Sequence, residues 1–219
     1  MRGPFQDRQE AGRELARSLA AYAHRDDVTL LALPRGGVPV GFEIATALGI
    51  PLEPFIVRKL GVPGQEELGF GAIASGGVRW VNHPLVKQLS LSPRVVEEVT
   101  ARQGLEVERR EQLYGDHRPR PQVSDRTVIL IDDGLATGGT MLAAIQAIQV
   151  QQPASLVVAV PVGSTEGCRS ISSRVDQLYC LLIPPELTSV GAWYREFEQV
   201  NDEEVRQLLN SAQAKPSTP

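Results

Sequence analysis

Short apolar runs alternate with longer amphipathic segments along most of the chain. The first amphipathic segment follows Asp7 and Glu10, a pair typical of a helix start, and its residues Leu15 and Leu19 recur at helical spacing. A short apolar run, VTLLAL at 28–33, comes next and stops at a proline. The pattern therefore predicts an amphipathic helix followed by a buried strand.

A strand, a turn and a helix repeat in the next part of the chain. The run at 28–33 leads into RGGVPVGFEIATALG, a glycine-rich turn and then a helix that Gly49 ends. The apolar run LEPFIVRKL at 52–60 follows at once. These elements predict a βαβ unit whose two strands are parallel.

Glycine is frequent between residues 61 and 80, where the apolar pieces are short. This composition predicts a mobile loop and a hairpin outside the main sheet, at about 61–82. A long helix is expected after Ser92, with Pro93 at its first position and Gly104 weakening its middle.

The last part of the chain returns to the alternation of strand and helix. Three strands and two helices are expected there, at 128–131, 155–161 and 177–183, and at about 140–151 and 165–173. The repeating order predicts an α/β fold of the doubly wound class, with a mainly parallel central sheet and a small flexible loop or hood. We expect a single domain over residues 1–212 and a disordered tail at 213–219.

The composition fits a globular protein and disfavours some classes of binding partner. The chain has 219 residues, and its 22 lysines and arginines against 26 acids give a net charge of -4. Nucleic acid is an unfavoured partner, because its binders carry a basic excess. Neither a secretory signal nor a stretch of about 20 apolar residues occurs, so we expect a cytoplasmic protein with no membrane contact. Cys168 and Cys180 lack metal-ligand spacing and are expected to be buried structural thiols.

The segment VILIDDGLATGGT, at 128–140, combines features that a simple turn does not need. An apolar strand ends at Asp132 and Asp133, and a run of small residues containing Thr137 and Thr140 follows. Glycine-rich backbone after a parallel strand, leading into a helix N-terminus, makes a phosphate cradle. Acids repel a phosphate unless they bind hydroxyls or a cation, so the segment indicates a sugar phosphate.

Other phosphate sites fit the sequence less well. A Walker A loop needs a Gly-Lys-Ser/Thr ending, but no lysine lies between Lys87 and Lys215. Neither glycine-rich turn has the G-x-G-x-x-G spacing of a dinucleotide site. An aspartyl phosphatase needs a second acid two residues after its nucleophile, whereas Gly134 follows Asp133. A solvated Asp-Gly turn explains an isolated DDG, but not the acids, threonines and glycine pair together.

The segment 128–140 resembles the phosphoribosylpyrophosphate (PRPP) binding motif of type I phosphoribosyltransferases. The resemblance lies in the apolar strand, the acidic pair and the small-residue loop, although Gly134 stands where the family usually has an apolar residue. It implies that Asp132 and Asp133 hold the two ribose hydroxyls. It also implies a loop that wraps the 5′-phosphate, made of Ala136, Thr137, Gly138, Gly139 and Thr140.

Two further segments resemble the same family. ALPRGGVPVG stands where the family has its pyrophosphate loop, and it implies that Arg35, Gly36 and Gly37 bind pyrophosphate. VRKLGVPG stands where the family has basic residues before a flexible catalytic loop, and it implies a catalytic role for Arg58 and Lys59. Together with ELGFGAIASGG, these segments resemble a bacterial subgroup of phosphoribosyltransferases over most of the chain.

The expected position of Arg58 and Lys59 in the fold also indicates a functional role, independently of the resemblance. Arg58 and Lys59 are expected at the end of a parallel strand, on the sheet edge that carries Asp133. A pyrophosphate needs cationic donors at that edge. For Arg35 the neighbouring glycine backbone is the stronger candidate donor.

The resemblance implies a Mg²⁺-dependent phosphoribosyltransferase that acts on PRPP and a nitrogenous base or nucleotide. Mg²⁺ is expected mainly on PRPP itself, with Asp132 as a candidate ligand, and a homodimer is expected because dimers are common in the family. A second hypothesis is a non-catalytic protein on the same fold that senses PRPP or a nucleotide. Trp193, Tyr194 and Phe197 are open to two interpretations, a base-stacking hood and core packing.

Overall fold

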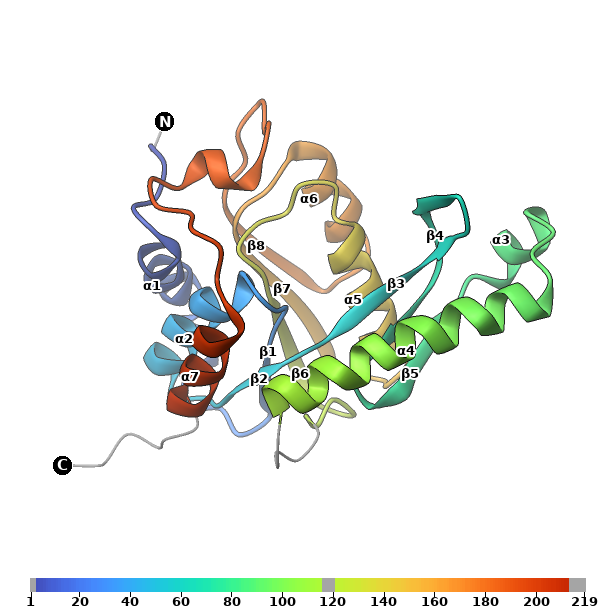
Figure 1. Ribbon diagram of the computed structural model, residues 1–219. Helices are drawn as coiled ribbons and strands as arrows, with labels where there is room; N and C mark the ends of the chain where they lie inside the picture. Colours follow the sequence, from blue (N-terminus) through green and yellow to red (C-terminus); the bar gives the residue numbers. More distant parts are fainter. Residues whose placement is uncertain (1–2, 116–120, 213–219) are drawn as a thin grey trace.

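The central sheet has five parallel strands in the order β2-β1-β6-β7-β8 (Figure 1). Their bounds are β1 Val28–Ala32, β2 Leu52–Pro54, β6 Thr127–Ile131, β7 Ser155–Val162 and β8 Gln177–Leu182. The computed structural model describes residues 3–115 and 121–212. Ala32 pairs with Ile131, so β1 and β6 end at the same level. The expected doubly wound fold with a parallel sheet is confirmed.

Helices cover both faces of this sheet (Figure 1). Leu30 and Ile129 pack in the cluster that includes α1, α2 and α7, whereas Leu31 and Leu130 pack with α5 and α6 on the other face. The bounds of these helices are α1 Arg8–Ser18, α2 Gly37–Leu48, α5 Gly139–Gln149, α6 Thr165–Ser172 and α7 Asp202–Ala212. Every residue of β1 and β6 is buried, which explains why both strands are predominantly apolar without alternation.

The predicted start of the first helix is confirmed. Asp7 caps α1, and its carboxylate accepts a hydrogen bond from the N–H of Glu10 at 2.7 Å. The helix ends earlier than its apolar pattern suggested, because Tyr22 belongs to the separate 3-10 turn η1 (Ala20–Tyr22).

The strand expected at 52–60 is divided between two sheets. β2 ends at Pro54, and β3 (Val57–Val62) belongs to a three-stranded antiparallel sheet. Between them, the N–H of Phe55 still donates to Ala32, but the N–H of Ile56 donates to the hydroxyl of Ser75 at 3.0 Å. The chain therefore leaves the parallel sheet after Phe55, so the prediction of one continuous parallel strand is wrong.

The glycine-rich segment forms most of that second sheet. β4 (Gln65–Ala74) pairs with both β3 and β5 (Val78–Val81), and the 3-10 turn η2 (Ser75–Gly77) joins β4 to β5. A Cβ on Gly71 would lie 2.5 Å from the carbonyl oxygen of Trp80. Glycine there permits close strand packing, so Gln65–Ala74 is a strand where a loop was expected, while the hairpin outside the main sheet is confirmed.

A long helix supports the antiparallel sheet. α4 (Pro93–Gly115) has 23 residues and runs along β3 and β4, after the short α3 (His83–Gln88) (Figure 1). Pro93 is its first residue, as expected. Gly104 lies within the helix, where an added Cβ would be 3.3 Å from Ile73 of β4. The glycine therefore brings α4 close to the sheet.

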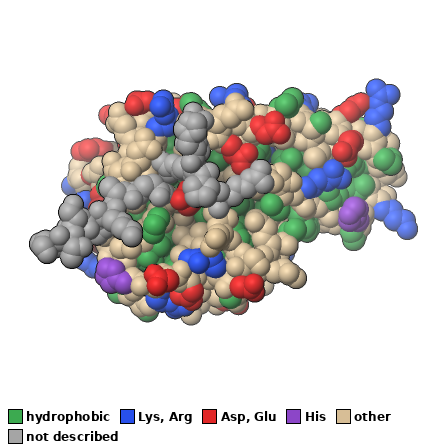
Figure 2. All heavy atoms as spheres, turned by 90° about the horizontal axis from the view of Figure 1, so that it is seen from below, with side chains coloured by type: hydrophobic (Ala, Val, Ile, Leu, Met, Phe, Trp, Pro, Cys, Tyr) green, Lys and Arg blue, Asp and Glu red, His purple; other side chains and the backbone are tan. Residues whose placement is uncertain are grey.

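The remaining predictions agree with the structure within a few residues at each end. β6, α5, β7, α6 and β8 follow in the expected order, and the expected tail at 213–219 lies outside the described residues. Figure 2 shows acidic and basic side chains interspersed on the visible face. Within residues 3–115 and 121–212, no helix is both long and apolar enough to cross a membrane.

Candidate functional site

A cavity lies at the carboxyl end of β6, where the phosphate cradle was predicted. Asp132 follows the strand, the chain turns through Gly138 with a φ of 78°, and α5 begins at Gly139. The cavity is lined by Asp132, residues 134–141 and Val190, and has a volume of about 180 Å³. Backbone N–H groups at the start of α5 and the positive end of its dipole favour an anion there.

All five residues predicted for the 5′-phosphate line this cavity. They are Ala136, Thr137, Gly138, Gly139 and Thr140. The loop is held from behind, because the N–H of Ser164 donates to the carbonyl of Leu135 at 2.8 Å and its hydroxyl donates to the carbonyl of Ala136 at 2.6 Å. The cradle is therefore preorganised by its contacts with the start of α6.

The structure gives a reason for glycine at position 134. A Cβ on Gly134 would overlap the side chain of Val190, which belongs to the 3-10 turn η3 (Val190–Trp193). Val190 thus occupies the space that a side chain at Gly134 would fill. No local signal in the sequence indicates this contact, because the two residues are 56 positions apart.

The two adjacent acids have different surroundings. Asp132 lines the cavity beside the loop 136–140, whereas Oδ2 of Asp133 accepts from Arg8 Nε of α1 at 2.8 Å. The N–H of Asp133 donates to Asp132 Oδ1 at 2.9 Å. Both acids belong to the site, but only Asp132 lines the cavity beside the loop.

Burial and mutual repulsion perturb the acidic pair. Burial raises the pKa of Asp132 well above its usual value, and the neighbouring charge of Asp133 raises it further. Burial also raises the pKa of Asp133, although the guanidinium of Arg8 opposes this shift. Such a pair is costly in the ligand-free protein and favours a partner that brings positive charge or hydroxyl donors.

The predicted pyrophosphate loop meets the acids. Gly36 and Gly37 follow β1 at the same sheet edge, and the peptide bond between Pro34 and Arg35 is cis. A Cβ on Gly36 would overlap the Asp133 carboxylate, and one on Gly37 would lie 2.6 Å from the carbonyl oxygen of Ile131. Glycine is therefore required at both positions for the two loops to approach each other.

The side chain of Arg35 points towards α7. Its Nη1 lies 3.8 Å from Oδ1 of Asp202, a carboxylate that also accepts from the hydroxyl of Tyr114. Burial, followed by the hydrogen bond to Asp202, raises the pKa of Tyr114 to about 12. The backbone of Gly36 and Gly37 thus lies beside the acids, whereas the guanidinium of Arg35 pairs with α7.

Arg58 and Lys59 do not stand at the end of a parallel strand. Both belong to β3 of the antiparallel sheet, where they pair in register with Ile73 and Ala72. Arg58 Nε donates to Oε1 of Gln103 on α4 at 3.0 Å. The expectation that they share the sheet edge of Asp133 is wrong, because the chain leaves the parallel sheet before it reaches them.

The aromatic segment after η3 is largely packed. Tyr194 is buried, its hydroxyl donates to the carbonyl of Asp133 at 2.6 Å, and its ring stacks on Phe197 with centroids 4.9 Å apart. The guanidinium of Arg8 also lies against Phe197, with its Cζ 3.8 Å from the ring centroid. For Tyr194 the core interpretation is therefore correct, while Trp193 stays half-buried.

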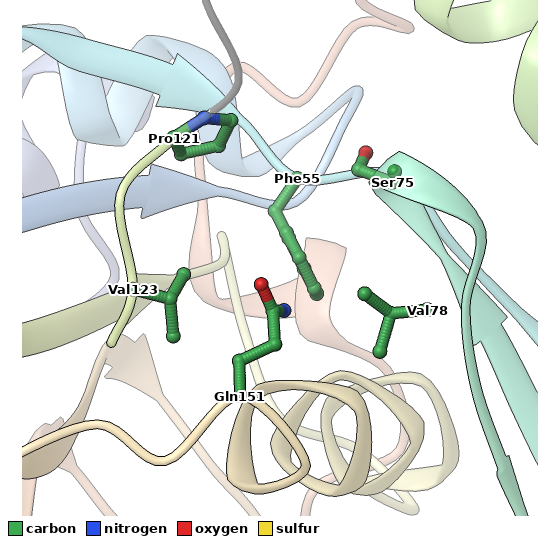
Figure 3. Close-up of a pocket in the computed structure, with 7 residues that line it drawn as sticks. Phe55, Ser75, Val78, Pro121, Val123 and Gln151 are labelled. Carbon is green, nitrogen blue, oxygen red and sulfur yellow. The ribbon is translucent and has the colours of Figure 1, made fainter.

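A second cavity lies where η2 and the start of β5 meet the segment before β6 and the chain after α5. Figure 3 shows Phe55 and Gln151 pointing into it, between Val78 and Val123. Ser75, Gly76 and Pro121 complete its lining, so it shares no residue with the phosphate loop. Elsewhere, Cys168 is buried and Cys180 half-buried, both as free thiols.

The fold and this loop place a candidate phosphate site at the edge of a parallel sheet. The sequence model of the phosphoribosyl transferase domain matches residues 5–180, so the chain belongs to the phosphoribosyl transferase family. The resemblance seen in the sequence is thereby confirmed.

Two relatives cover nearly all of the chain. A Mycobacterium tuberculosis protein named "Putative phosphoribosyl transferase" is 40% identical over 208 residues, which are 95% of this chain and 47% of that protein. The crystal structure of TT1426 from Thermus thermophilus is 36% identical with a TM-score of 0.87, and the match covers 96% of this chain and all of that one. The chain thus spans about half the length of the curated relative.

Three residues of the site were missed by the sequence analysis. Arg8 contacts Asp133, Val190 lines the cavity beside the loop 136–140, and Asp202 pairs with Arg35. Arg8 lies in the first turn of an amphipathic helix, where a charged residue is ordinary. None of the three carries a local motif, because each acquires its role through a contact between distant parts of the chain.

Proposed function

We propose that the protein is a Mg²⁺-dependent phosphoribosyltransferase, which transfers the 5-phosphoribosyl group of PRPP to a nitrogenous base and releases pyrophosphate. The observation that carries this proposal is the cavity that joins Asp132 to the loop 136–140 at the start of α5. A phosphate cradle with a carboxylate on its wall suits a sugar phosphate better than a simple anion.

The ligand contacts follow from the chemistry of the residues. The 5′-phosphate accepts from the N–H groups and hydroxyls of 136–140, and Asp132 accepts from a ribose hydroxyl. The N–H of Gly36, with Arg35, is the proposed donor to pyrophosphate. The N–H of Gly37 donates to the carbonyl of Leu33 at 3.1 Å, so the proposed part of Gly37 is to let the loop approach the ligand closely. The corresponding ribose contact of Asp133 requires its carboxylate to leave Arg8.

The proposed reaction separates positive from negative charge, and residues of the site are suited to stabilise each of them. Positive charge develops at the anomeric carbon while negative charge builds on the departing pyrophosphate. The carboxylates beside the ribose stabilise the positive centre, and Arg58 and Lys59 are proposed to stabilise the leaving group. Closure of the β3–β4 hairpin over the ligand would exclude water, which otherwise hydrolyses PRPP.

Mg²⁺ fits this donor set as a partner of the substrate. It takes oxygen ligands and is bound in phosphate sites mainly by the phosphates with one or two carboxylates, for which Asp132 is the candidate. Bound there, it neutralises negative charge on pyrophosphate. In the described ranges, no group of three or more His, Cys, Asp or Glu residues is arranged to hold a metal.

The acceptor and the activity are tested together by a screen. Purines, pyrimidines and related heterocycles are each incubated with PRPP and Mg²⁺, and pyrophosphate release is measured. We expect turnover with at least one base and none when Mg²⁺ is chelated. A homodimer and a cytoplasmic location belong to the same proposal and are tested by sedimentation and by fractionation.

A pair of titrations tests the recognition of the sugar. The double variant Asp132→Asn with Asp133→Asn removes two negative charges near the phosphate, so inorganic phosphate should bind it equally well or better. PRPP should bind it more weakly, because hydrogen bonds from the ribose hydroxyls lose their charged acceptors. If both ligands change in the same direction by similar amounts, the acids do not recognise the sugar and the proposal fails.

One observation favours a second candidate, a PRPP- or nucleotide-sensing protein on the same fold. Asp133 is already occupied by Arg8, and one face of Phe197 is covered by the same guanidinium. A sensor would bind PRPP tightly and release no pyrophosphate with any base. The screen and the titrations together therefore separate the two functions.

A further inference from the structure

The two cysteines of the chain meet at one glycine. Cys168 lies on α6 and Cys180 on β8, and both are free thiols. A Cβ on Gly163, the residue after β7, would lie 2.5 Å from Sγ of Cys168 and 3.1 Å from Sγ of Cys180. Both sulfur atoms therefore flank the same backbone position. Glycine there leaves the space to the two thiols, because a larger residue would overlap them.

The two thiols interact with each other and differ in reactivity. The hydrogen bond with Cys180 lowers the pKa of Cys168, although burial opposes this shift. The same bond and burial raise the pKa of Cys180. Sγ of Cys180 also lies 3.3 Å from the carbonyl oxygen of Leu182, a second acceptor for its proton. Because the thiolate is the form that reacts with oxidants, Cys168 is the reactive member of the pair.

Hydrogen bonds connect this thiol pair to the loop beside the candidate phosphate cavity. The N–H of Ser164 donates to the carbonyl of Leu135 at 2.8 Å, and the hydroxyl of Ser164 donates to the carbonyl of Ala136 at 2.6 Å. The neighbouring N–H of Gly163 donates to the carbonyl of Leu182 on β8 at 3.0 Å. Ser164 also caps α6. A shift of α6 relative to β8 is therefore transmitted to the loop.

We propose that Cys168 and Cys180 form an oxidation site, at which hydrogen peroxide closes a disulfide and thereby changes the support of the loop 136–140. The Cys168 thiolate attacks one oxygen of the peroxide, the O–O bond breaks, and a sulfenic acid and hydroxide form. The Cys180 sulfur then attacks the sulfenic sulfur, and its proton leaves with the hydroxyl group as water. The two thiols thus lose two electrons, and the peroxide gains them.

The disulfide has to move α6 relative to β8. Two bonded sulfurs lie about 2.0 Å apart, much closer than two thiols in contact. The new bond therefore draws Cys168 and Cys180 together beside Gly163 and weakens the hydrogen bonds that Ser164 makes to the loop. Formation of the disulfide is independent of the proposed function, whereas its effect on PRPP binding rests on that function.

The first experiment maps the disulfide. Folded protein is treated with hydrogen peroxide, alkylated, digested and analysed by mass spectrometry without reduction. We expect two peptides joined through Cys168 and Cys180, lighter by two hydrogen atoms than the separate peptides, and their separation by dithiothreitol. In Cys180→Ala, the sulfenic acid of Cys168 has no partner and should be trapped by dimedone. Unreacted thiols, or sulfinic acid at Cys168 of the wild type, would overturn the proposal.

The second experiment follows the loop in the ligand-free protein. Amide hydrogen exchange of Ser164 should be about tenfold faster in the oxidised than in the reduced wild type, because the disulfide weakens the bond from this amide to Leu135. The double variant Cys168→Ala with Cys180→Ala is the matched control and should exchange at the same rate before and after peroxide. Unchanged exchange in the oxidised wild type contradicts the coupling to the loop.

The third experiment measures PRPP binding by calorimetry in the presence of Mg²⁺. The oxidised wild type should bind PRPP about threefold or more weakly than the reduced protein, because its loop is less well preorganised, and dithiothreitol should restore the affinity. The double variant separates the thiols from Met141, which lines the same cavity and is also a target of peroxide. A loss of affinity that persists in the double variant assigns the effect to Met141 and removes the thiols from it.

The three experiments distinguish this inference from the proposed function. If the reduced wild type does not bind PRPP, the proposed function is wrong, but peptide mapping and hydrogen exchange still decide whether the thiol pair controls the loop. Both compare oxidised with reduced wild type and need no substitution. If the reduced protein binds PRPP and no disulfide forms, only the inference fails.

Discussion

Glycine has a different structural role in each of the two sheets of this protein. In the parallel sheet, Gly36 and Gly138 lie in turns after buried strands, where the backbone approaches another loop or a ligand cavity. In the antiparallel sheet, Gly61 and Gly71 lie inside strands, where an added Cβ would be 2.5 Å from the backbone of a neighbouring segment. A similar local composition therefore indicates a ligand-facing turn in one sheet and close strand packing in the other.

Arg58 of β3 gives the strongest test of this difference between the sheets. If Arg58 takes part in the reaction, the antiparallel sheet also contributes to the site. Arg58→Gln should lower the rate of pyrophosphate release by about 10²-fold if the guanidinium stabilises the leaving group. Steady-state kinetics with the base found in the screen measures the effect.

The matched control is Gln103→Ala, which removes the partner of Arg58 on α4 and leaves the guanidinium in place. It should keep most of the activity. If Arg58→Gln retains full turnover, Arg58 does not stabilise the leaving group, and the difference between the two sheets is larger than proposed.

Gly36 tests the close approach in the parallel sheet. Gly36→Ala should lower the free energy of unfolding by about 1–3 kcal/mol, because the new methyl group overlaps the Asp133 carboxylate and forces the loops apart. Urea denaturation monitored by circular dichroism measures the change. Gly3→Ala is a suitable control, since a Cβ at Gly3 meets nothing within 4 Å; equal stability of the two variants would show that the loops are not in contact.

Thr140 tests the ligand side of the same edge. Thr140→Ala should weaken PRPP binding by about 1–2 kcal/mol and leave the fold intact, because one hydroxyl donor to the 5′-phosphate is lost. Isothermal titration calorimetry gives the affinity, and Thr140→Ser, which keeps the hydroxyl, should bind like the wild type. Unchanged affinity in Thr140→Ala removes this residue from the site.

Glu106, on the helix that supports the antiparallel sheet, should give the smallest effect. Hydrogen bonds from Arg109 and then Arg110 lower the pKa of Glu106 from 4.5 to about 2. A depressed pKa stabilises the fold above the ordinary value, and this contribution is lost as the pH falls from about 4.5 to about 2. Because Glu106 and its two arginine partners are largely solvated, Glu106→Gln should lower the free energy of unfolding by no more than about 0.5–1 kcal/mol at pH 7.

The pH dependence is the sharper part of that prediction. The difference in unfolding free energy between Glu106→Gln and wild type should shrink as the pH is lowered and disappear near pH 2. Glu98→Gln is the control, since Glu98 pairs with the exposed Arg94 and should have a weaker effect at any pH. A difference that stays constant with pH would show that the carboxylate is not held by the arginines.

The sequence alone determined strands β1, β6, β7 and β8, helices α1, α2, α5 and α6, and the loop between β6 and α5. Strands β1 and β6 are buried on both faces, so their apolar runs are local signals. The loop 136–140 is also local, because one short segment contains the strand end, the glycines and the helix start. Where a predicted feature lies within one continuous stretch, residue order was sufficient to predict its place in the fold.

Only the tertiary structure decided where β3 leaves the parallel sheet and what the two acids contact. Arg58 follows an apolar run that resembles one strand, but the hydrogen bond from Ile56 to Ser75 diverts the chain. Asp132 and Asp133 are indistinguishable as letters, yet Arg8, 125 positions away from Asp133, and Gly36 give them separate environments. The physical reason is that side-chain direction and ion pairing at this edge depend on the packing of α1 and residues 190–198 against β6, which no local pattern encodes.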